Sequence, residues 1–134
     1  MLNLDYLCMK HGQEIGGVTD ENNLRKALGV LQEDGVYAMF LWIQKKVDKD
    51  ADKDKEKKSE KPRLAGKIID LLNEDEIRKV FLREDRRFEK DFTAFTKQLT
   101  YEVAQDIDKL LFMKKVLERT LVYALYHAKK ETNE

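Results

Sequence analysis

The sequence predicts an all-α protein: a compact bundle of five to six helices with a long C-terminal helix and one charged, disordered insert. Apolar residues recur at steps of three and four along most of the chain, which is the spacing of one helix face. Residues 101–129 keep this spacing without any Gly or Pro. No segment carries the alternating pattern of a strand. The 134 residues are expected to form one domain, 1–134.

Composition limits the classes of protein. Lys+Arg and Asp+Glu both number 26, so the net charge is zero and indicates no particular partner. Charged residues make up 39% of the chain, against about 25% in an ordinary soluble domain. This density favours the surface of a thermophile's protein and a strongly solvated helical protein equally.

The single cysteine, Cys8, excludes an internal disulfide and a cysteine metal cage. Its apolar neighbours favour a buried, inert thiol over a nucleophile. The longest apolar run, Val36 to Ile43, is far shorter than the roughly 20 residues of a membrane span. No signal peptide is visible at the start. We therefore expect a cytoplasmic protein with no membrane partner.

The first third of the chain is expected to hold three helices. Residues 2–11 form a short helix, which the glycines of His11–Gly17 end. A second helix begins at an N-cap and runs to Gly35. Apolar residues occupy nearly every position of the third helix, Val36–Val47, so it should be buried on most sides. The candidate N-caps of the second helix are Thr19 and Asp20.

Residues 48–61 are the charged insert. Every position is charged except Ala51 and Ser59, so no hydrophobe can attach the segment to a core. Its first aspartates resemble the start of a calcium loop. However, Lys53 occupies the position of the turn glycine and Ser59 that of the bidentate glutamate. The pattern therefore predicts a flexible surface insert and no metal site.

Two further helices precede the terminal one. Pro62 suits the first turn of a helix that runs to Leu72. Asn73 followed by Glu76 is a capping pattern that starts another helix. The apolar spacing of this helix continues to Leu99, and the terminal helix follows it with or without a break.

A basic stripe lies on the predicted helix over 73–99. On an ideal helical wheel, six cations fall within roughly 100° of one another, opposite the apolar face, along about 27 Å. Such a stripe suits a phosphodiester backbone, and its arginines suit planar pairing with phosphate. An ion-pairing surface for another subunit and a merely solvated basic face are the alternatives. The six residues are Lys79, Arg83, Arg86, Arg87, Lys90 and Lys97.

The terminal helix is apolar on two sides. One stripe contains Leu117, Leu121 and Leu125 and is typical of a core face. The second stripe is either core or a partner interface, which tyrosine and arginine together would favour. Its candidate interface residues are Tyr101, Phe112, Arg119, Tyr123 and Tyr126.

No catalytic or cofactor-binding constellation is recognisable. The chain has no Gly-rich phosphate loop, no nucleophile elbow and no pair of catalytic acids. His11 and His127 do not form the Glu-x-x-His pairs of di-iron bundles. We therefore expect a binding or scaffold module that is not an enzyme and holds no cofactor.

Three segments carry a family resemblance. Val30–Lys45 has a Gln, a Gly and then an aliphatic-aromatic run ending in lysine; Lys67–Leu72 is leucine-rich. In Glu102–Ala124, an acid and an alanine precede an aliphatic-aromatic stretch with a basic pair. Together these segments resemble the small helical subunit of type III-B CRISPR effectors, the Cmr complex. The order Phe-Leu-Trp at 40–42 and the charged insert depart from that family's pattern.

The resemblance implies a non-catalytic subunit that is present in several copies, which stack along the groove holding the guide and target RNA. Its partners would be other CRISPR effector subunits, both RNAs and copies of itself. Carried over by position, the RNA-contacting residues would be Lys45, Lys114 and Lys115. A type III-A counterpart, another CRISPR-associated helical protein, a protein-only adaptor and a regulatory module of a partner enzyme are the alternatives.

Overall fold

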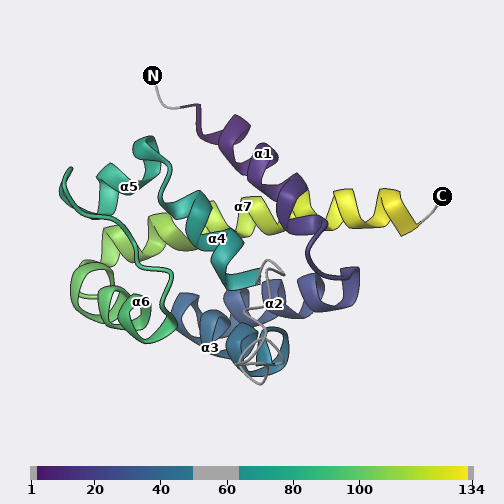
Figure 1. The fold of residues 1–134 in the computed structure, drawn as a ribbon, viewed down its shortest axis with the longest axis horizontal. Helices are drawn as coiled ribbons and strands as arrows, with labels where there is room; N and C mark the ends of the chain where they lie inside the picture. The colour runs from purple at the N-terminus through teal and green to yellow at the C-terminus, as the bar shows by residue number, and fades with distance from the viewer. Residues whose placement is uncertain (1–2, 50–63, 133–134) are drawn as a thin grey trace, which may run out of the picture.

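A computed structural model describes residues 3–49 and 64–132 and is drawn in Figure 1. The all-α class and the long C-terminal helix are confirmed, because the described residues form seven α-helices, one π-helical segment and no strand. The helices are α1 (Leu4–Gly16), α2 (Glu21–Asp34), α3 (Val36–Lys46), α4 (Leu64–Leu72), α5 (Asp75–Phe81), α6 (Phe92–Gln98) and α7 (Ile107–Thr132). The π-helical segment is η2 (Leu99–Val103). The predictions for Pro62 and for positions 50–61 of the insert fall outside the described residues.

The long helix α7 runs through the middle of the bundle. It packs against α1, α2 and α3, while α4 packs against α1 and α3 (Figure 1). The side chains of α7 that enter the core are Met113, Val116, Leu117, Thr120, Leu121, Ala124 and Ala128. The predicted core stripe is thus confirmed for Leu117 and Leu121, while Leu125 is partly buried and packs against the core.

Helix α1 continues through two of the glycines that were expected to end it. A Cβ on Gly12 would lie 2.7 Å from Cβ of Tyr123, and one on Gly16 would lie 2.8 Å from the Ala124 carbonyl oxygen. Only glycine permits this approach of the two helices. The glycines therefore serve packing against α7, and the helix ends later, at Gly16, with Gly17 as its C-cap.

The corner between α2 and α3 follows the sequence closely. Asp20 caps α2 by accepting a hydrogen bond from the Asn23 backbone amide at 2.8 Å. Gly35 separates the helices with φ of +101°, a conformation that favours glycine. The burial expected on most sides of α3 is wrong on one side, because Tyr37 and Leu41 are exposed.

The continuous helix predicted over 73–99 is wrong. Helix α5 ends at Phe81 and α6 begins at Phe92, and the ten residues 82–91 between them are not helical. Phe81, Phe88 and Phe95 are buried at spacings of seven, which a helix would also produce. Here they meet edge-to-face, with ring centroids of Phe88 and Phe95 5.7 Å apart. The three phenylalanines are therefore spaced as on one helix face, although they are buried together by a loop and two separate helices.

The terminal helix begins later than predicted. A turn at 104–106 separates η2 from α7, and the Asp106 carboxylate accepts from the Asp108 amide at 3.0 Å. Asp106 acts as the N-cap of α7. Tyr101 consequently lies on η2 and does not share a helix with Tyr126.

Candidate functional site

The segment 82–91, here called the arginine loop, is held in place by a buried guanidinium. Arg78 is 7% exposed, and its Nη1 donates to the carbonyl oxygens of Arg83, Glu84 and Arg86 at 2.9–3.2 Å. Its Nη2 also pairs with Asp75 at 3.2 Å. One side chain thus donates to three carbonyls of a non-helical segment.

Two amide side chains hold the rest of the arginine loop. Asn73 accepts from the Phe88 amide at 2.7 Å and donates to the Phe88 carbonyl at 2.9 Å. Gln98 accepts from the Glu89 amide at 2.8 Å and donates to the Arg87 carbonyl at 2.9 Å. Asn73 is therefore no N-cap, contrary to the sequence prediction, since Glu74 occupies that position of α5.

Sequence reasoning missed all three of these positioning residues. A signal for Arg78 was present, because it was the one cation of 73–99 that fell outside the basic side of the wheel. Nothing in the pattern distinguished Asn73 from a cap, or Gln98 from a surface residue of a helix.

The predicted basic stripe is therefore not a straight row on one helix. Its residues divide among three elements: Lys79 lies on α5, Lys97 lies on α6, and the other four lie on the arginine loop. All six are exposed. That these six residues form one nucleic-acid surface stays a prediction. The expectation that they share one face of a single helix is wrong.

The pairing of these six cations divides them further. Arg86 forms an ion pair with Glu102 of η2, and Lys90 pairs with Asp70 of α4 at 2.8 Å. The remaining four, Lys79, Arg83, Arg87 and Lys97, have no ion-pair partner among the residues that the structure describes.

A surface recess adjoins the arginine loop. It has a volume of about 470 Å³ and brings the loop next to the start of α7. Lys109 of α7 reaches into this region and donates to the Phe81 carbonyl at 3.4 Å. The recess thus gathers three cations and one carboxylate from three segments: the arginine loop, η2 and α7. Its lining is Phe81, Leu82, Arg83, Arg86, Glu102 and Lys109.

The remaining candidate cations lie elsewhere. Lys45 is exposed near the end of α3. Lys114 is half-buried, with Nζ 3.4 Å from the Gln32 carbonyl and 4.0 Å from Glu118. Lys115 is exposed on α7. Among the described residues, no hydrogen bond or ion pair joins these three cations to the arginine loop.

Three of the candidate interface residues line one groove along α7. Arg119, Tyr123 and Tyr126 border it together with Lys115, and its volume is about 610 Å³. The Tyr123 hydroxyl donates to Asp5 of α1 at 2.7 Å, and this hydrogen bond raises the pKa of the phenol. Tyr123 therefore links α1 and α7 at the wall of the groove.

The other two candidate interface residues lie apart. Phe112 packs inward against Phe81, with ring centroids 5.7 Å apart. Tyr101 is well exposed on η2. The predicted partner interface is thus not a single surface, although the role of each residue in binding a partner stays a prediction.

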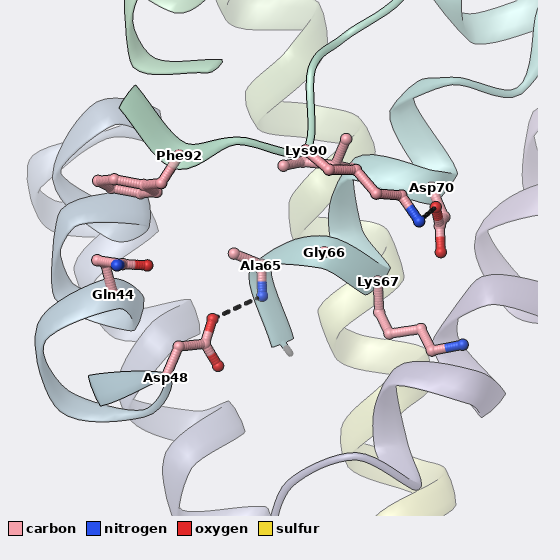
Figure 2. A pocket seen from close by; sticks show the side chains of 9 residues that line it. Gln44, Asp48, Ala65, Gly66, Lys67, Asp70, Lys90 and Phe92 are labelled. Atoms are coloured by element: carbon pink, nitrogen blue, oxygen red, sulfur yellow. Dashed lines mark hydrogen bonds and ion pairs between the residues drawn. The ribbon is translucent and has the colours of Figure 1, made fainter. Parts of the chain in front are cut away.

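A smaller pocket of about 350 Å³ lies where α3, α4 and the start of α6 meet (Figure 2). Asp48 is buried there and accepts from the backbone amides of Leu64 and Ala65 at 3.0 and 3.1 Å. It therefore supplies the N-terminal cap of α4 across the insert. Asp48 had been assigned to the flexible insert, which is wrong for this residue.

Cys8 is buried, as expected, and its Sγ lies 3.8 Å from the Val116 carbonyl oxygen. Burial raises the pKa of this thiol, which disfavours the reactive thiolate. Among the described residues, no three His, Cys, Asp or Glu side chains are grouped so that they could hold a metal ion. Within the same part of the chain, no helix combines the length and the apolar character needed to cross a bilayer.

No family model, curated protein or solved structure matches this chain.

Proposed function

We propose that this chain is a non-catalytic subunit of an RNA-guided CRISPR effector, and that it contacts the backbone of the guide or target RNA through the arginine loop. The family proposal rests on the resemblance of three segments, Val30–Lys45, Lys67–Leu72 and Glu102–Ala124. The contact proposal rests on one observation: three internal side chains hold a non-helical loop whose arginines face solvent.

This arrangement favours phosphate binding because the loop backbone is already ordered. Positioning Arg83 and Arg87 then costs only side-chain entropy when a ligand binds. A guanidinium can donate two parallel hydrogen bonds to one phosphate, and the contact carries no information about base sequence. Loops that a rigid scaffold holds in this way frequently carry binding residues.

The charge balance of the loop limits the strength of that contact. Its four cations are matched by four carboxylates, those of Glu84, Asp85, Glu89 and Asp91. A long-range positive field is therefore weak, and attraction depends on local pairing of guanidinium with phosphate. The isolated subunit should bind RNA weakly, and neighbouring subunits of the assembly should strengthen binding by adding contacts.

The test measures affinity for single-stranded RNA of mixed sequence between about 50 and 200 mM salt. Each phosphate contact contributes about −0.7 to the log–log slope. Arg86 is paired with Glu102, so replacing Arg83, Arg86 and Arg87 by Gln should remove the two contacts of Arg83 and Arg87 and flatten the slope by about 1.4. The matched control, K10Q/R25Q/K26Q, removes three exposed cations from α1 and α2. It should leave the slope unchanged.

Both variants should be measured as isolated protein and within the reconstituted effector complex. An unchanged affinity and slope for the arginine-loop variant in both settings would exclude the loop as the nucleic-acid surface. An equal loss in the control variant would mean that only net charge matters.

A further inference from the structure

Helix α7 has an outward face that the other helices do not cover, and it differs from the second stripe predicted from the sequence. Three of its apolar side chains are far more exposed than a core helix requires: Ile107 is 69% exposed, Leu111 57% and Tyr126 68%. Val122, between them, is 39% exposed. On a helical wheel these residues share one side with two cations. The outward face comprises Ile107, Leu111, Lys115, Arg119, Val122 and Tyr126.

The order of side chains along this face is specific. Two apolar residues lie at one end, two cations in the middle, and two apolar residues at the other end, at steps of three or four. The distance from Ile107 to Tyr126 is about 28 Å at 1.5 Å per residue. Exposed apolar side chains that gather on one surface are typical of a protein-binding site.

The two central cations are available to a partner. Neither Lys115 nor Arg119 has an ion-pair partner among the described residues. Two carboxylates line the groove beside these cations, and both are engaged elsewhere: Glu118 is directed to Lys114 at 4.0 Å, and Asp5 accepts from the Tyr123 hydroxyl at 2.7 Å. A third carboxylate, that of Asp108, lies on the same side of α7 at the end next to Ile107. A partner that binds this face would therefore complement it best with negative charge at its centre and apolar residues at both ends.

We propose that this face docks an amphipathic helix of a partner protein, with apolar residues at both ends and glutamate or aspartate near its middle. A helix of roughly 20 residues would match the length of the face. RNA fits the face less well, because the aliphatic Ile107, Leu111 and Val122 have no aromatic surface on which a base could stack. The proposal does not depend on the arginine loop and would stand if the RNA-binding proposal failed.

The test uses synthetic helical peptides of about 20 residues with leucines at helical spacing. One set has glutamates at its centre and the matched set has lysines there, and several leucine spacings are included. Affinity for the full chain is measured by fluorescence anisotropy. We expect glutamate peptides to bind, and lysine peptides to bind at least about tenfold more weakly.

Two variants separate the contributions of charge and apolar contact. K115E/R119E should reverse the preference, weakening glutamate peptides and strengthening lysine peptides. L111S/Y126S should weaken both sets. Because these side chains are exposed, circular dichroism should show unchanged helicity in both variants. R83Q/R87Q, which removes two cations of the arginine loop, is the control and should leave peptide binding unchanged.

Three results would overturn the proposal. The first is equal affinity for the two peptide sets, or no binding by either. The second is displacement of the glutamate peptide by RNA, which would make the face a nucleic-acid surface. The third is a concentration-dependent dimer of the chain alone that L111S/Y126S abolishes, which would make the occupant a second copy.

Discussion

Gly12→Ala is the substitution that most sharply tests how α1 meets α7. The added Cβ would lie 2.7 Å from Cβ of Tyr123 and 3.0 Å from the Thr120 carbonyl oxygen. Ordinary contact begins near 3.4 Å, so the two helices must separate by about 0.7 Å at this point. Neither neighbouring atom is the end of a flexible side chain, so relief requires a shift of the backbone.

The magnitude follows from two opposing terms. Overpacking of this kind costs about 1–3 kcal/mol, whereas alanine is more favourable than glycine within a helix by about 0.8–1 kcal/mol. Separation of the helices also weakens the dispersion contacts along α1. We expect Gly12→Ala to lower the free energy of unfolding by about 1–2 kcal/mol.

Gly29→Ala is the matched control. Gly29 lies within α2 and has no atom within 4 Å of an added Cβ. This variant should therefore gain only the higher helix propensity of alanine, and its free energy of unfolding should rise by about 0.5–1 kcal/mol. Urea unfolding followed by circular dichroism measures both variants. Gly12→Ala proving as stabilising as Gly29→Ala would refute the close approach of α1 and α7.

Three further predictions concern single side chains. Arg78→Met should free the arginine loop, so that amide exchange and proteolysis there increase, while global stability falls by about 1–2 kcal/mol; unchanged exchange would contradict the role of this guanidinium. Glu102→Gln should release Arg86 for phosphate and steepen the RNA salt slope by about 0.7, and a flatter slope would contradict the proposed competition. The raised pKa of Tyr123 means that its hydrogen bond to Asp5 stabilises the fold below the ordinary tyrosine pKa of 10.0, and that this contribution disappears as pH rises through the higher folded-state pKa. Wild type should therefore lose stability above about pH 10 more steeply than Tyr123→Phe, and parallel pH profiles would contradict this.

The sequence predicts helix ends well where a single residue determines the local backbone conformation. Asp20 caps α2, and Gly35 adopts positive φ, as their residue types suggest. The sequence-based prediction fails for Gly12. This glycine is required because α1 lies close to Tyr123, which is more than a hundred residues away in the sequence. Composition alone cannot distinguish a glycine that ends a helix from one that admits a second helix.

The candidate site was less predictable for the same reason. The apolar spacing of 73–99 satisfied a helix, but long-range hydrogen bonds from Arg78, Asn73 and Gln98 stabilise a loop instead. Exposure of Arg83, Arg86 and Arg87 was predictable from their charge, whereas the burial of Arg78 was not. Their arrangement was not, since it depends on which buried polar side chain captures which backbone group.

The most direct test of the central claim is photocrosslinking of the assembled protein to RNA that carries azidophenacyl groups on backbone phosphorothioates, followed by mass-spectrometric identification of the crosslinked peptides. We predict crosslinks within residues 82–91, and their loss in the variant that replaces Arg83, Arg86 and Arg87 by Gln. The control K10Q/R25Q/K26Q should retain them. Crosslinks confined to the outward face of α7, or an absence of crosslinks from the assembled protein, would contradict the assignment of the arginine loop to the RNA backbone.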